Sequence, residues 1–186
     1  MLEDVATTRY EANPAPDPLA MVQALANTIS VGPGEDLLAS ADSATRWLAS
    51  IATARHPVAD EASLGRLRSL RAALRVVLGD HPPAPEQPVD LTLRLRLRDG
   101  RVTVVDDGVD VVEAGVALAL LEGRATGELS RLKLCANPDC RVAFYDHSKN
   151  GGGKWHSPTR CGNAARVRAH RSRTAGEAAA DQERPS

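Results

Sequence analysis

The sequence predicts an α+β fold in which a mostly helical N-terminal domain with a β-hairpin precedes a small cysteine-bearing module that ends in a basic helix. Three observations support this prediction. Leucines recur at helical spacing between residues 64 and 78, leucines alternate with polar residues between residues 91 and 98, and all three cysteines lie after residue 134. The first pattern has the period of an amphipathic helix, and the second has the period of a half-buried strand.

The chain of 186 residues divides into four predicted segments. Residues 1–17 contain the proline-rich run Asn13–Asp17 and show no periodicity, which predicts a flexible arm. Residues 18–130 hold the periodic elements and are expected to fold by themselves as an α+β domain. Residues 131–173 form the cysteine-bearing module. Residues 174–186, rich in Ala, Glu and small polar residues, are expected to be a disordered tail.

Three helices are expected before the strands. Leu19 begins a short apolar helix, and two longer helices follow it. Their apolar residues are spaced by three and four, so each helix should bury one stripe. These residues are Ala44, Trp47, Leu48 and Ile51 in one helix, and Leu64, Leu67, Leu70, Leu74 and Leu78 in the other.

A proline-rich connector over residues 80–88 leads to the predicted hairpin. Asp99-Gly100 is a preferred two-residue hairpin turn. The aliphatic side chains of both strands then share one face, which we expect to be buried against the domain. In this register Arg98 pairs with Arg101, Leu97 with Val102 and Leu95 with Val104.

A further helix is expected after the hairpin. Asp110 and Glu113 have the spacing of a capping box ahead of the apolar run 114–121. The four carboxylates between residues 106 and 113 also raise the alternative of a divalent-cation site, but local helix capping accounts for them.

Charge separates the two parts of the chain. Residues 1–130 hold 19 acidic and 12 basic residues, whereas residues 131–173 hold 2 acidic and 10 basic residues. This asymmetry indicates that the C-terminal module faces a polyanion. The sequence contains no long apolar segment and no secretory signal pattern, so a cytoplasmic protein without a membrane partner is expected.

The cysteines belong to two matched pairs. Cys135 and Cys140 flank an Asn-Pro-Asp turn, and His156 and Cys161 have the same separation. A short chain usually supplies four tetrahedral zinc ligands as two pairs on two turns, so these four residues predict one bound Zn²⁺ and a treble-like zinc module. The alternatives are three buried thiols, a redox pair, or His147 in place of His156 as the fourth ligand.

The module ends in a predicted basic helix from about Pro158 to Arg173, with Ser157 as its N-cap. The helix carries five arginines and no carboxylate. One face of small residues should pack on the zinc centre, namely Cys161, Ala165, Ala169 and Ser172. A helical wheel directs Arg160, Asn163, Val167 and Arg171 away from the zinc as candidates for base contacts, flanked by Arg166, Arg168 and Arg173 as candidates for phosphate contacts.

The module resembles the CGNR zinc-finger family of bacterial proteins. The resemblance rests on the cysteine pair, a Phe-x-Asp-x-Ser run, a tryptophan and the signature tetrapeptide, which here are Cys135, Cys140, Phe144, Asp146, Ser148, Trp155 and Cys161-Gly162-Asn163-Ala164. Upstream, the segments Ala24–Thr28, Asp36–Ala39 and Trp47-Leu48 resemble landmarks of the ABATE domain that accompanies this finger. Residues 18–130 are thus ABATE-like and residues 131–173 are CGNR-like.

The chain departs from the family pattern at two positions. His156 stands where the family has its third cysteine, which retains a good zinc ligand. Ala164 replaces the arginine of the signature, so the role of that arginine is open here, and Arg160 or Arg166 are candidate substitutes.

The resemblance implies a DNA-binding transcription regulator linked to stress responses, and the basic helix agrees with it. A small-molecule effector and a homodimer are further partners consistent with this hypothesis. The alternative is a protein-interaction module in which zinc only stabilises the C-terminal part. Four protein ligands leave zinc no open position, so an enzyme is not expected.

Overall fold

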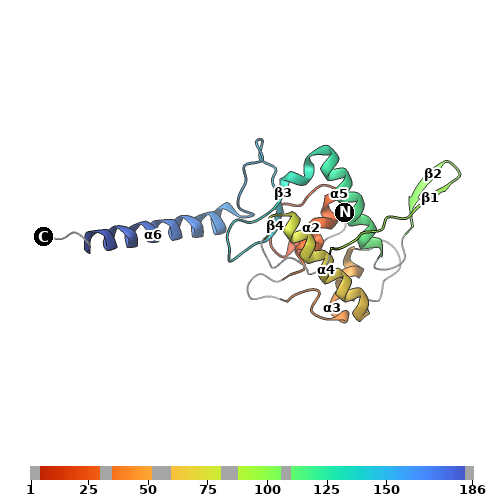
Figure 1. Ribbon diagram of the computed structural model, residues 1–186, viewed down its shortest axis with the longest axis horizontal. Coiled ribbons are helices and arrows are strands. Elements are labelled where there is room, and N and C mark those ends of the chain that lie inside the picture. The colour runs from red at the N-terminus through yellow and green to blue at the C-terminus, as the bar shows by residue number, and fades with distance from the viewer. Residues whose placement is uncertain (1–4, 30–34, 52–59, 81–87, 106–109, 183–186) are drawn as a thin grey trace.

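Five helices form the N-terminal part of the computed structural model, which describes residues 5–29, 35–51, 60–80, 88–105 and 110–182. They are α1 (Val5–Thr8), α2 (Leu19–Ala26), α3 (Ala41–Ile51), α4 (Glu61–Val77) and α5 (Asp110–Thr126). The helices gather into one body, from which a hairpin and a long helix extend at opposite ends (Figure 1). The predicted leucine stripe of α4 is buried, and the Asp60 carboxylate caps this helix by accepting the Ser63 N–H at 2.7 Å. The residues just before α5, including part of the proposed carboxylate group, lie outside the described ranges.

The main hydrophobic core extends into the cysteine-bearing module. It joins aliphatic residues of α2, α3, α4 and α5 to Leu132, Leu134, Ala143 and Tyr145. These four residues belong to a small antiparallel sheet of β3 (Leu132–Leu134) and β4 (Ala143–Tyr145). Two strands of three residues cannot form a core alone, so their apolar side chains are buried against the helices. The core therefore crosses the boundary that the sequence places at residue 130.

The N-terminal segment differs from the flexible arm expected over residues 1–17. From Ala6 onward it packs on the body, and Ala6 itself is fully buried. The Arg9 guanidinium donates to the carbonyls of Asn27 at 2.7 Å and Thr28 at 3.1 Å. The Asn13 carbonyl accepts the Tyr145 N–H at 3.1 Å. The prolines at positions 14, 16 and 18 exclude a regular helix between α1 and α2, but the segment still makes buried contacts.

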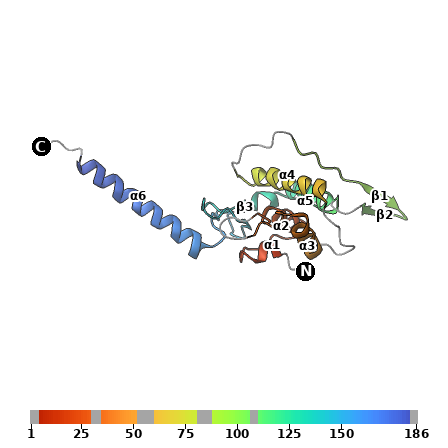
Figure 2. The ribbon, with the colours of Figure 1, turned by 90° about the horizontal axis from the view of Figure 1, so that it is seen from below.

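The hairpin of β1 (Leu95–Arg98) and β2 (Arg101–Val104) has the predicted register. Its expected burial was wrong. Leu97 is 76% exposed and Val102 is 63% exposed, because the strands extend beyond the helices into solvent (Figures 1 and 2). In the segment that leads to β1, Val89 and Leu91 pack against the core.

The last helix, α6 (Asn163–Gln182), follows a π-helical turn at Pro158–Gly162. Helix α6 includes residues 174–182, most of the segment that was expected to be a disordered tail. Ala is frequent there and has strong helix propensity. Helix α6 extends away from the body in both views (Figure 2). Within the described residues, no helix has the length and apolar character needed to cross a membrane.

Candidate metal centre and basic helix

The first ligand pair lies in the loop between β3 and β4. The Asn137 side chain accepts the Asp139 N–H at 3.3 Å, and the Asn137 carbonyl accepts the Cys140 N–H at 2.9 Å. Arg141 closes the turn with a φ of 52°, in the left-handed region. These bonds hold Cys135 and Cys140 at one tip of the sheet, as the Asn-Pro-Asp sequence predicts.

A buried carboxylate organises the loop that carries the second pair. Asp146 accepts the Lys133 ammonium at 2.8 Å and the backbone N–H groups of Ser148 at 3.0 Å and Gly153 at 2.7 Å. These donors, the Lys133 ammonium first, hold the pKa of Asp146 well below its usual range. The loop then returns to the first pair, where the Ala136 N–H donates to the Lys154 carbonyl at 2.8 Å.

Local helix capping positions the last ligand. The Ser157 side chain accepts the Arg160 N–H at 3.3 Å, and Pro158 occupies the start of the turn, as predicted. The Cys161 N–H donates to the Ser157 carbonyl at 2.8 Å. The cap therefore fixes the backbone at Cys161, five residues after His156.

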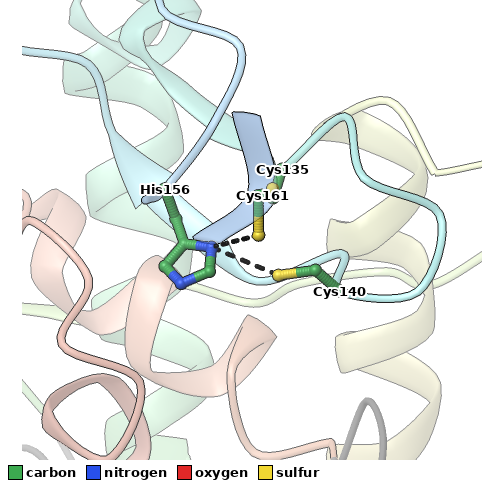
Figure 3. A group of neighbouring side chains, drawn as sticks. All are labelled: Cys135, Cys140, His156 and Cys161. Carbon is green, nitrogen blue, oxygen red and sulfur yellow. Dashed lines mark hydrogen bonds between the residues drawn. The ribbon is translucent and has the colours of Figure 1, made fainter. Parts of the chain in front are cut away.

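The four predicted ligands converge. Their ligand atoms all lie within 4.8 Å of one another, and Cys135 and Cys161 are buried. The Nδ1 atom of His156 lies 3.2 Å from Cys140 Sγ and 3.5 Å from Cys161 Sγ (Figure 3). In a tetrahedral zinc site, Zn–S and Zn–N bonds of about 2.3 and 2.0–2.1 Å separate S from N by about 3.6 Å. The cluster is thus positioned to bind a metal ion, and its donors suit zinc.

The thiols of the first pair influence each other. The Cys140 thiol donates to Cys135, and the backbone N–H groups of Asn137 and His156 also donate to this sulfur, so the pKa of Cys135 is lowered. The same contact with Cys135 raises the pKa of Cys140. Without a cation the pair therefore favours one thiolate over two, and both sulfurs must be deprotonated to ligate a metal.

His147, the alternative fourth ligand, lies elsewhere. Its ring packs edge-on against Tyr145 with centroids 4.8 Å apart, and it is not part of the cluster. Two aromatic side chains pack within the module. Phe144 is buried with Ala12 and Val142, and Trp155 lies so close to Gly162 that a Cβ there would be 3.3 Å from its ring.

Two of the arginines that we expect to bind nucleic acid instead form ion pairs with carboxylates of the same chain. Arg160 pairs with Glu11, and Arg168 pairs with Asp139 at 2.8 Å and with the Asn137 side chain at 2.6 Å. These partners were not predicted from the sequence, because Glu11 lies in the expected flexible arm and Asp139 was assigned only to a turn.

The remaining predicted contacts lie on α6. Asn163 accepts a hydrogen bond from Arg166 at 2.8 Å, Val167 is 49% exposed, and Arg171 and Arg173 are exposed. The small face expected to pack on the zinc centre does so only at its start. Among its members, Ala169 and Ser172 are exposed because α6 leads away from the module (Figure 2).

Two buried amides connect the body to the module. The Asn27 side chain accepts the Ala143 N–H at 2.8 Å and donates to the Ala143 carbonyl at 2.9 Å, so it extends the small sheet as a neighbouring peptide would. Gln23 donates to the same carbonyl at 3.1 Å. Gln23 lies in the mostly apolar helix α2 and Asn27 directly follows it. Amides at these positions were the available sequence signal, because buried amides require hydrogen-bond partners.

Comparison with known proteins agrees with this geometry. None of the curated proteins compared matches the chain. The segment that holds the metal centre and the start of α6, residues 131–174, matches the CGNR zinc finger family.

Proposed function

We propose that this chain is a DNA-binding transcription regulator in which the zinc centre fixes the base of α6 and presents the helix to duplex DNA. The ABATE-like residues 18–130 would sense a signal, such as a small-molecule effector in a stress response, or mediate assembly as a homodimer. This proposal adds a nucleic-acid partner to the zinc module already described.

The observation that carries the proposal is the contrast between the two ends of α6. Cys161, in the turn that leads into α6, belongs to the metal cluster, and Arg168 in α6 is tied to Asp139. Beyond Arg168 the helix extends away from the body (Figure 2), and the side chains of Arg171 and Arg173 are exposed, as is that of Arg166. A rigidly anchored, exposed basic helix suits the phosphates and grooves of DNA.

Electrostatics gives the proposal a quantitative test. Each phosphate neutralised contributes about −0.9 to the slope of log affinity against log salt. The α6 variant, Arg166→Gln/Arg171→Gln/Arg173→Gln, should therefore flatten this slope by about 1.8 when Arg166 and Arg173 neutralise phosphates, and by about 2.7 when Arg171 does so too. The slope is measured by fluorescence anisotropy with a short mixed-sequence duplex. The zinc-loaded full chain serves as the reference.

The body control is a variant that removes the same charge from exposed arginines of α3, α4 and α5, namely Arg46→Gln/Arg66→Gln/Arg124→Gln. It should leave the slope unchanged. An α6 variant that behaves as the body control does would refute contact through α6 and favour the protein-interaction alternative.

A further inference from the structure

The exposed hairpin has a basic face opposite its aliphatic face. Side chains alternate along a strand, so Arg96 and Arg98 lie on the same side of β1. The register places Thr103 opposite Arg96 and Arg101 opposite Arg98. Together with Asp99, these residues line a shallow hollow of about 520 Å³. We name the set Arg96, Arg98, Arg101 and Thr103 the hairpin basic face.

This charge arrangement opposes the stability of the isolated hairpin. Arg98 and Arg101 are a directly opposed pair of like charges, which destabilises an antiparallel ladder. Arg98 Nε pairs with the Asp99 carboxylate at 3.5 Å, and both side chains are more than 80% exposed, so this ion pair contributes little stability. Within the described ranges, no carboxylate forms an ion pair with Arg96 or Arg101. The repulsion would be relieved by an anionic ligand.

We infer that the hairpin basic face is a second contact for duplex DNA, on a surface separate from α6. The inference goes beyond the proposed function, since it holds whether or not α6 binds. Three arginines on one face of a narrow ribbon complement a row of phosphates, and the major groove admits a two-stranded β-ribbon. An acidic protein is the competing partner, but a protruding ribbon of this shape fits a groove better than a flat protein surface.

The position of the hairpin supports this assignment. It projects beyond the helices at the end of the molecule opposite α6, so the body does not block its approach to a duplex (Figure 1). The segment before β1 is fixed where Val89 and Leu91 pack against the core. The exposed Leu97 and Val102 lie on the other face, directed away from the DNA.

The test uses the zinc-loaded full chain and the same duplex. The hairpin variant, Arg96→Gln/Arg98→Gln/Arg101→Gln, should flatten the salt slope by up to about 2.7, whereas the body control should not change it. The charge-preserving variant Arg96→Lys/Arg98→Lys/Arg101→Lys should keep most of the slope.

If the hairpin variant has the same salt slope as the body control, the inference is overturned, and an acidic protein becomes the better candidate partner for this face. Equal flattening in the lysine variant would overturn it too, because the effect would then come from altered hairpin structure. Comparison with the α6 variant separates the two proposals. Loss only in the hairpin variant supports this inference and refutes the α6 proposal, and loss only in the α6 variant does the reverse.

Discussion

Replacing Asn27 by alanine tests whether the helical body and the zinc module are one folded unit. Asn27 is 1% exposed, and its amide makes two hydrogen bonds to Ala143, at 2.8 and 2.9 Å. Alanine would leave the Ala143 N–H buried without this partner, whereas the Ala143 carbonyl would keep its bond from Gln23. The lost hydrogen bond therefore destabilises the edge of β4, next to the metal centre.

The expected cost follows from these bonds. Two lost hydrogen bonds, of about 0.5–1.5 kcal/mol each, and one unsatisfied donor lower the free energy of unfolding by about 2–4 kcal/mol. Urea unfolding would be followed by far-ultraviolet circular dichroism and by zinc release to a chromophoric chelator. Both signals should move together to a midpoint lower by about 1–2 M urea.

The matched control is Asn150→Ala, because Asn150 is exposed in the loop of the module. Its effect should stay within about 0.5 kcal/mol. If Asn27→Ala shifts zinc release but leaves the circular dichroism transition in place, the body and the module are separate units and the reasoning fails.

Three further predictions concern the module. His156→Ala should lose tight zinc binding, whereas His156→Cys and His147→Ala should keep one zinc per chain in native mass spectrometry; zinc loss in His147→Ala would reverse the ligand assignment. Gly153→Ala should lower the free energy of unfolding by about 1–3 kcal/mol, because the new Cβ would lie 2.6 Å from Asp146 Oδ1, whereas Gly152→Ala meets no atom within 4 Å and should be tolerated. Asp146→Asn should lower the free energy of unfolding by an amount that is constant above about pH 3.9 and shrinks at lower pH, because the lowered pKa of Asp146 stabilises the folded protein only while the carboxylate is ionised. A difference in unfolding free energy between wild type and variant that grows below pH 4 would contradict the assignment.

Local patterns in the sequence predicted the elements and the ligands. Leucine spacing predicted α4, the Asp99-Gly100 turn fixed the register of β1 and β2, and the matched cysteine and histidine pairs identified the metal cluster. Each of these depends on neighbours within a few turns of chain, where spacing determines geometry.

Contacts between distant segments could not be predicted in the same way. The alternation of apolar and polar residues shows that Leu97 and Val102 share one face of the hairpin. It does not show that the helices end before they cover this face. The prolines at positions 14, 16 and 18 exclude a helix just before Leu19, but they do not exclude packing of that segment on the body. The pairing of Arg160 with Glu11 depends on where the chain folds back, which no local pattern records.

The most direct test of the account is an amide NMR titration of the zinc-loaded full chain with duplex DNA at about 50 mM salt, where a polycationic surface binds even without sequence preference. The largest shifts should fall on residues 163–174 of α6 and on Arg96–Arg101 of the hairpin, and the interior of α4 should stay unchanged. Absence of salt-dependent shifts, or shifts confined to the helical body, would contradict the claim that this zinc module presents a basic helix to DNA.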